Sequence, residues 1–101
     1  MNKYGNHKTV VGSLRFDSIR EANRWGELLL LQRAGAISDL DRQVKLPIDV
    51  NGEKVCTYIA DFQYYEGGKL VVEDVKGIRT PLYNLKKKLV KAIYGIEILE
   101  T

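Results

Sequence analysis

Apolar and polar residues alternate on both sides of a Gly-Gly pair in residues 58–77. A period of two is typical of strands with one buried face, and Gly-Gly is a common two-residue turn, so the stretch predicts a β-hairpin. With residues 67–68 as the loop, Glu66 pairs with Lys69. This pairing fixes the register of every other position in the hairpin.

The same register gathers charged side chains on one face of the hairpin. Counting back from the loop places Asp61 opposite Asp74, and alternation puts Lys76 on the same face. Directly opposed carboxylates destabilise a sheet, and a divalent cation bound to their oxygens would remove the penalty. The alternative is a set of solvent-facing charges in which Lys76 neutralises one acid. Glu73 alternates to the opposite face, so it is not expected as a ligand.

A helical pattern precedes the strands. Ser18 and Glu21 fit a capping box at the start of a helix that runs to about Ala34, and Gly35 suits the position after its end. Glu21 lies at the edge of the buried stripe, so it has two candidate roles. It either completes the capping box or serves as a third carboxylate near the hairpin acids.

A second helix is expected at residues 81–94, with Thr80 as its N-cap, Pro81 in its first turn and Gly95 at its end. Four apolar residues at helical spacing form its expected buried stripe: Leu82, Leu85, Leu89 and Ile93.

Between the helices the pattern predicts three strands, at residues 37–50, 54–65 and 70–75. Asn51-Gly52 is a strong turn signal between the first two, and Pro47 indicates an edge strand or a bulge. A last short strand, residues 96–99, is expected to pair in parallel after the helical crossover. The order α-β-β-β-α-β predicts one α/β domain over residues 1–101, with residues 1–11 as a loose arm carrying a short strand at 9–14.

Composition supports a single soluble domain. The 101 residues are 45% hydrophobic with a net charge of +3, which is ordinary for one modest core. No apolar run approaches the roughly 20 residues of a membrane span, and residues 1–8 lack a signal-peptide pattern. The lone Cys56 cannot form an internal disulfide. A cytoplasmic protein without membrane association is therefore expected.

Positive charge gathers on the second predicted helix and near the N-terminus. Such clusters are typical of surfaces that bind nucleic acid, although a solvated helix face is the common alternative. The two groups are Lys86, Lys87, Lys88 and Lys91 on the helix, and Lys3, His7 and Lys8 near the start of the chain.

The element order and the acids together resemble the PD-(D/E)xK nuclease superfamily. That superfamily carries an Asp on its second core strand and an acid-x-Lys on its third. Asp61 matches the first acid and residues 74–76 match the second element, with Ala60 in place of the motif's Pro. Glu21 matches a Glu that many members carry on the first helix.

Longer stretches extend the resemblance over residues 3–98. Small phage-encoded members of the superfamily, which are similar to Holliday-junction resolvases and transposon end-cutting nucleases, resemble FDSIREANRW, SDLDRQVKLPI, YIADF and VVEDVKG. The resemblance implies a restriction-endonuclease-like core, in which a mixed sheet is flanked by two helices.

The resemblance also implies Mg²⁺- or Mn²⁺-dependent hydrolysis of phosphodiesters. Asp61, Asp74 and the Val75 carbonyl would be metal ligands, and Glu21 would bind a second ion or orient water. Lys76 would position the attacking water or stabilise the developing charge, its alternative being a salt bridge to Asp74.

Gln43 is a further candidate, because several nucleases of this kind carry a Gln on the first strand. Simple pairing across the Asn51-Gly52 turn puts Gln43 opposite Ala60, on the face away from Asp61. A one-residue bulge near Pro47 would reverse this orientation.

The expected substrate is DNA that is branched, nicked or flapped, since no helix-turn-helix or zinc finger that reads bases is visible. Two cuts in a symmetric junction imply a homodimer, and a phage protein partner is a further possibility. The alternatives are a non-catalytic DNA-binding module and a subunit active only with a partner. The expected phosphate contacts are Lys86, Lys87, Lys88, Lys91, Arg79 and Lys8.

Overall fold

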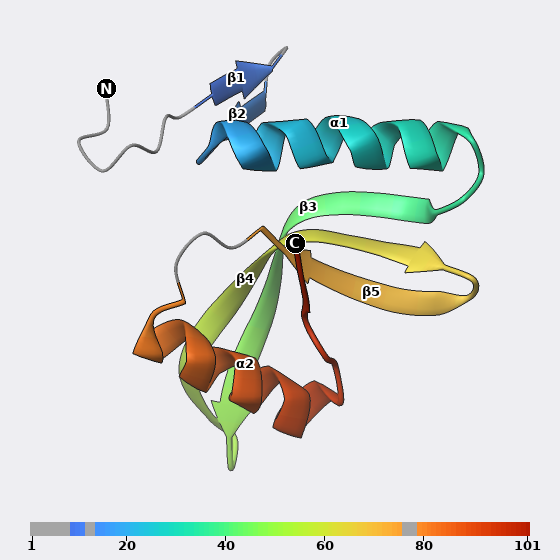
Figure 1. Ribbon diagram of the computed structural model, residues 1–101. Coiled ribbons are helices and arrows are strands. Elements are labelled where there is room, and N and C mark those ends of the chain that lie inside the picture. Colours follow the sequence, from blue (N-terminus) through green and yellow to red (C-terminus); the bar gives the residue numbers. More distant parts are fainter. Residues whose placement is uncertain (1–8, 12–13, 76–78) are drawn as a thin grey trace.

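The structure is a computed structural model that describes residues 9–11, 14–75 and 79–101 (Figure 1). Two residues with expected functions, Lys8 and Lys76, lie outside the described residues. Within the described ranges the elements follow the order β1 (Thr9–Val11), β2 (Leu14–Phe16), α1 (Ile19–Arg33), β3 (Ser38–Val50), β4 (Glu53–Glu66), β5 (Lys69–Asp74), α2 (Pro81–Tyr94) and β6 (Leu99–Glu100).

The described part of the chain is a small α/β domain with a mixed four-stranded sheet and two helices. The strand order is β3-β4-β5-β6, in which β5 and β6 are parallel and the other pairs antiparallel. The expected parallel pairing after α2 is therefore confirmed. β1 and β2 pair in a separate two-stranded sheet, where the sequence predicts one short strand.

Both helices begin where their capping residues predict. The Ser18 hydroxyl accepts the backbone N–H of Glu21 at 3.1 Å, and the Thr80 hydroxyl accepts that of Tyr83 at 3.1 Å. These side chains satisfy amides that have no partner inside a helix. α2 ends at Gly95, whose φ of 69° suits a residue without a side chain.

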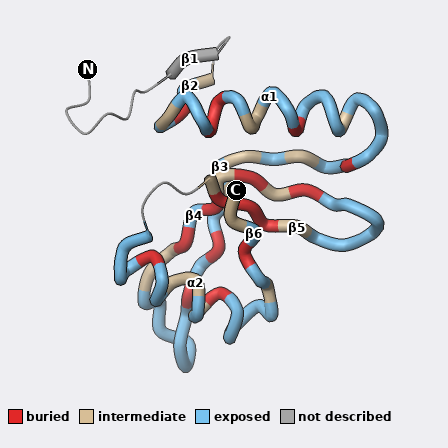
Figure 2. Tube along the Cα trace, viewed as in Figure 1, coloured by how far each residue is buried: buried red, intermediate tan, exposed pale blue. Residues whose placement is uncertain are grey.

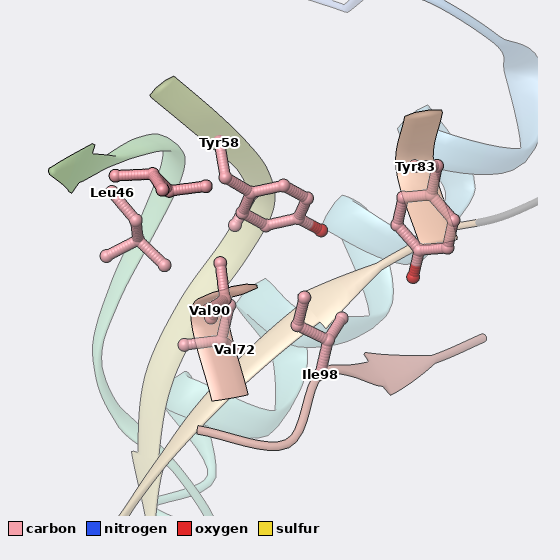
Figure 3. Close-up of a cluster of buried hydrophobic side chains, with 8 residues drawn as sticks. Leu46, Tyr58, Val72, Tyr83, Val90 and Ile98 are labelled. Atoms are coloured by element: carbon pink, nitrogen blue, oxygen red, sulfur yellow. The ribbon is translucent and has the colours of Figure 1, made fainter. Parts of the chain in front are cut away.

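The core has two parts, one beneath each helix (Figure 2). α1 packs on the half of the sheet nearer the β4–β5 turn, where Leu28, Ile37, Phe62 and Tyr64 are buried together. α2 packs on the half nearer the β3–β4 turn. Figure 3 shows the second cluster, whose labelled members are Leu46, Tyr58, Val72, Tyr83, Val90 and Ile98.

The central hairpin has the predicted register. Glu66 pairs with Lys69, and the regular β4–β5 ladder ends at the pair Phe62 and Glu73. The next positions along the two strands are Asp61 and Asp74. The predicted acids therefore lie where regular pairing between β4 and β5 ends.

The pairing of β3 with β4 contains the one-residue shift that the sequence left open. It lies between Ile48 and Asp49, next to Pro47, which occupies an edge strand as predicted. Beyond the shift, Arg42 pairs with Phe62 and Val44 with Ala60. Gln43 is consequently opposite Asp61.

The predicted buried stripe of α2 is wrong for three of its four residues, whereas the fourth, Leu89, packs partly buried against the core. Leu82 and Leu85 are 60% and 54% exposed, and Ile93 is 43% exposed, whereas Tyr83 and Val90 are buried. Successive residues of an α-helix are 100° apart around its axis. The predicted apolar row therefore lies about a quarter turn from the face of α2 that packs on the sheet. The fully buried contacts of α2 come from Tyr83 and Val90.

The last strand is also displaced from its predicted position. It comprises Leu99–Glu100 rather than residues 96–99. Ile98 is buried beneath α2, and Ile96 packs against the same cluster. The apolar alternation in this segment therefore fills the core before the chain reaches β5. In the described residues, no helix is long and apolar enough to cross a membrane.

Candidate carboxylate site

Asp61 and Asp74 are joined by reciprocal hydrogen bonds between β4 and β5. The backbone N–H of Asp61 donates to the Asp74 carboxylate at 3.1 Å, and the backbone N–H of Val75 donates to the Asp61 carboxylate at 2.9 Å. Each carboxylate thus binds a main-chain amide of the opposite strand. These side-chain bonds connect the two chain segments just beyond Phe62 and Glu73, the last backbone pair of β4 and β5.

The solvent-facing interpretation of these acids is wrong. Asp74 is fully buried, and Asp61 is half-buried. Hydrogen bonds from amides stabilise a carboxylate in its charged form, which offsets part of the cost of placing two acids together. The two acids are therefore hydrogen-bonded parts of the sheet and not charges on a solvent-exposed face.

Glu21 faces this site from the first turn of α1 and is only 4% exposed. One of its carboxylate oxygens accepts the Gln43 side-chain amide at 3.3 Å and lies 3.8 Å from a guanidinium nitrogen of Arg42. The backbone of Glu21 still takes part in the cap, through its N–H to Ser18. The side chain thus contacts β3 through Gln43, and its role as a third carboxylate beside the hairpin acids stays a prediction.

Burial and charge repulsion both act on Glu21. Burial is the larger effect, and the carboxylates of Asp61 and Asp17 add to it, so the pKa of Glu21 rises from 4.5 to about 7. A hydrogen bond from the Asp17 backbone and the charge of Arg42 oppose the rise. A carboxyl with this pKa and an acidic neighbour is a frequent feature of functional sites.

Gln43 reaches the site because of the backbone of β3. The register shift places it opposite Asp61, and its φ of 54° is unusual for a residue with a side chain. Strained backbone of this kind gathers at functional sites. Simple hairpin counting across the Asn51-Gly52 turn misses this position, and the signal that could have found it is Pro47.

The donor set suits a hard divalent cation. Asp61 and Asp74 offer carboxylate oxygens, and oxygen is the ligand that Mg²⁺ and Mn²⁺ prefer. Among the described residues, no three His, Cys, Asp or Glu side chains converge closely enough to hold a metal ion together. An ion here would have two carboxylates and several waters, as is usual for Mg²⁺.

A third buried acid, Glu73, faces away from the pair, as alternation predicts. Its carboxylate accepts two hydrogen bonds from Arg24 of α1 at 2.7 and 3.0 Å, one from the Tyr64 hydroxyl at 2.7 Å and one from Thr101 at 3.0 Å. Burial alone would raise the pKa of Glu73, but these bonds hold it below 4.5. Sequence reasoning missed this network, which ties α1 to β5.

The predicted phosphate contacts on and near α2 are largely engaged inside the chain. Arg79 and Lys87 pair with Glu100, at 2.9 and 3.3 Å, and Lys91 pairs with Glu97 at 2.5 Å. Lys86 donates to the Thr57 carbonyl at 3.2 Å. Within the described part of the chain, Lys88 makes no ion pair. The lysines still border a hollow of about 470 Å³ lined by Asn84, Lys87, Lys88, Lys91, Ile96, Glu97 and Ile98.

Sequence reasoning did not select Arg42, a basic residue whose guanidinium lies 3.8 Å from the Glu21 carboxylate. Arg42 of β3 stacks over the Phe16 ring at 4.4 Å and donates to the Arg15 carbonyl at 2.8 Å. Its guanidinium is therefore partly covered by β2.

The fold and the site define a class: a small α/β domain with a carboxylate pair where two strands of its mixed sheet separate. The chain belongs to the DUF1064 family, described as a protein of unknown function, whose model matches residues 1–98. No curated protein and no solved structure matches the chain.

Proposed function

We propose that this protein is a metal-dependent DNA endonuclease that hydrolyses phosphodiester bonds. The observation that carries the proposal is the reciprocal bonding of Asp61 and Asp74 across β4 and β5, with Glu21 and Gln43 beside them. Its second support is the resemblance to the PD-(D/E)xK superfamily, whose signature acids fall on these positions.

Each residue has a role in the proposed chemistry. Asp61 and Asp74 would hold Mg²⁺ or Mn²⁺ with the Val75 carbonyl, and a bound ion lowers the pKa of its water and neutralises charge on the phosphate. Glu21, with a pKa of about 7, is suited to accept a proton from water or to bind a second ion. Lys76 is proposed to position the attacking water.

The pair of backbone bonds determines which variants test this proposal. Asn keeps an oxygen that accepts an amide but loses the charge that binds a cation, so Asp61→Asn and Asp74→Asn should fold. Both should lose at least 100-fold in cleavage rate, because one removed ligand costs several kcal/mol of transition-state stabilisation. Asp49→Asn, an exposed acid near the β3–β4 turn, is the matched control.

Cleavage should be measured on labelled four-way junction, flapped, nicked and linear DNA, with Mg²⁺, Mn²⁺ or EDTA. We expect metal-dependent cutting by the wild type and the control but not by the two site variants. Cutting that survives in Asp74→Asn would show that the site is assigned wrongly. The best substrate would identify the DNA structure that the protein selects.

We further propose a homodimer acting in phage recombination or DNA processing, with or without a phage protein partner. The support is the resemblance to junction resolvases, because a symmetric junction needs two cuts. Light scattering coupled to gel filtration measures the oligomeric state, and a monomer that still cuts both strands of a junction would contradict the homodimer.

The complete burial of Asp74 favours a second candidate, a DNA-binding module or a subunit activated by a partner protein. A carboxylate with no exposed surface binds an ion after local movement, and a partner is one source of that movement. This candidate predicts tight binding of junction DNA with no cleavage in either metal, and cleavage on addition of the partner.

A further inference from the structure

A hollow of about 180 Å³ adjoins the carboxylate site on its β3 side. Its lining consists of Arg15, Asp17, Arg42 and Gln43. Gln43 belongs both to this hollow and to the site, because its amide donates to Glu21. Arg15, Asp17 and Gln43 are exposed, so the hollow is open to solvent.

The guanidinium of Arg42 is held in a fixed orientation by contacts other than a close ion pair. It lies over the Phe16 ring at 4.4 Å and donates to the Arg15 carbonyl at 2.8 Å. Glu21 is 3.8 Å away, beyond hydrogen-bond distance. The Arg42 Nε is buried and has no hydrogen-bond partner among the described residues. Internal bonds therefore use a small part of its five donors.

The charge of the hollow suits an anion with several oxygens. The lining carries two guanidinium groups, one carboxylate (that of Asp17) and the neutral Gln43 amide. The Glu21 carboxylate lies behind the lining, 3.8 Å from Arg42, and burial and its acidic neighbours oppose its charge. A planar guanidinium binds two phosphate oxygens at once, and stacking on an aromatic ring orders it beforehand. Less side-chain freedom is then lost when a phosphate binds.

We propose that Arg42, with Arg15 beside it, binds the DNA phosphate next to the one cleaved at the carboxylate pair. This inference rests on the proposed function, because the hollow would hold a neighbouring phosphate only if the adjacent acids cleave DNA. Arg42, and not a lysine of α2, would then contact the phosphate next to the cleaved bond. Arg42 is a positioning residue, since it touches the backbone of the substrate and not the reacting atoms.

The first test measures binding of a labelled four-way DNA junction in Ca²⁺, over a range of salt concentrations. Arg42→Gln should bind about tenfold more weakly at low salt, and its salt slope should fall by about one, as for one lost phosphate contact. Arg42→Lys should keep the salt slope but bind several-fold more weakly, because Lys keeps the positive charge and lacks the planar group that binds two phosphate oxygens at once. Lys54→Gln, an exposed cation near the β3–β4 turn, is the matched control and should bind like the wild type.

The second test replaces single junction phosphates by neutral methylphosphonates. In the wild type one position should weaken binding, and in Arg42→Gln the same replacement should have no further effect. A merely structural role of Arg42 would leave the two profiles alike, which would overturn the proposal. If thermal unfolding shows that Arg42→Gln does not fold, the exposed Arg15→Gln carries the same measurements.

Cleavage in Mg²⁺ separates this proposal from the proposed function. Cutting by the wild type with no effect of Arg42 on slope or profile would leave the nuclease standing and reject the phosphate site. An Arg42-dependent profile without cutting in any metal would support the phosphate site and reject the nuclease.

Discussion

Glu21 is a carboxyl whose ionisation the fold opposes. It lies in the first turn of α1, where burial and the nearby carboxylates of Asp61 and Asp17 raise its pKa from 4.5 to about 7. A carboxyl whose pKa rises on folding holds its proton more tightly in the folded state. Its contribution to stability is complete below pH 4.5 and is lost as the pH rises through 7.

Glu21→Gln should therefore stabilise the metal-free protein at pH 8. Gln cannot ionise, and each pKa unit corresponds to about 1.4 kcal/mol, so the gain relative to the wild type is on the order of 3 kcal/mol at pH 8 and near zero at pH 4. Urea unfolding at both values measures it. Glu53→Gln, an exposed carboxyl beside the β3–β4 turn, is the control. An equal effect of Glu21→Gln at both pH values would contradict the prediction.

Arg24 should be the most costly surface-facing residue of α1 to replace. Its side chain is 25% exposed, but its partner Glu73 is completely buried. Arg24→Met removes one member of the pair and leaves a charge without its main partner, which costs about 3 kcal/mol. Chemical denaturation at pH 7 measures the loss. Arg33→Met, at the exposed end of the same helix, should change stability by less than about 0.5 kcal/mol, and similar losses in both variants would refute the assignment.

At the scale of elements, α2 presents one apolar row to the sheet and another to solvent. Val90 is completely buried, whereas Leu85 is 54% exposed. Val90→Ala should therefore cost about 2 kcal/mol and Leu85→Ala less than about 0.5 kcal/mol. Thermal unfolding compares the two variants. The reverse order would show that the predicted stripe, and not the observed one, faces the core.

The sequence predicted elements whose boundaries depend on local chemistry. The capping residues Ser18 and Thr80 and the turn at residues 67–68 act within a few residues, so helix starts and hairpin register followed directly. The burial of α2 depends on how the helix is rotated on the sheet, which its own pattern does not determine. An apolar row at helical spacing shows that a surface is apolar, not which surface packs.

The candidate site divides in the same way. Asp61 and Asp74 followed from the hairpin register, because both lie within a few residues of one turn. Gln43 depended on a shift in a strand 13 residues long, and Arg42 on the packing of β2 against β3. Long-range contacts of this kind leave little trace in the local pattern of a single sequence.

At the scale of the whole molecule, a bound cation should stabilise the fold. A ligand that binds the folded state alone contributes RT ln(1 + [L]/Kd), about 1.4 kcal/mol at ten times its Kd. Mg²⁺ should raise the melting temperature of the wild type at pH 8, and EDTA should reverse the rise. Asp61→Asn should show no such rise. An equal rise in the variant would indicate a general salt effect and would argue against an ion at the carboxylate pair.

The backbone hydrogen bonds of the Asp61 and Asp74 side chains also limit which substitutions evolution can accept at these two positions. Losing the side-chain oxygen at either position leaves a main-chain amide without its partner, so selection for folding alone would retain Asp or Asn at both positions. Glu21 is under the opposite pressure, because its buried charge weakens the fold at neutral pH. Among relatives, Asp or Asn at both positions would then indicate a preserved sheet. If the proposed nuclease function is correct, a retained Glu21 would mark a lineage that still cuts DNA.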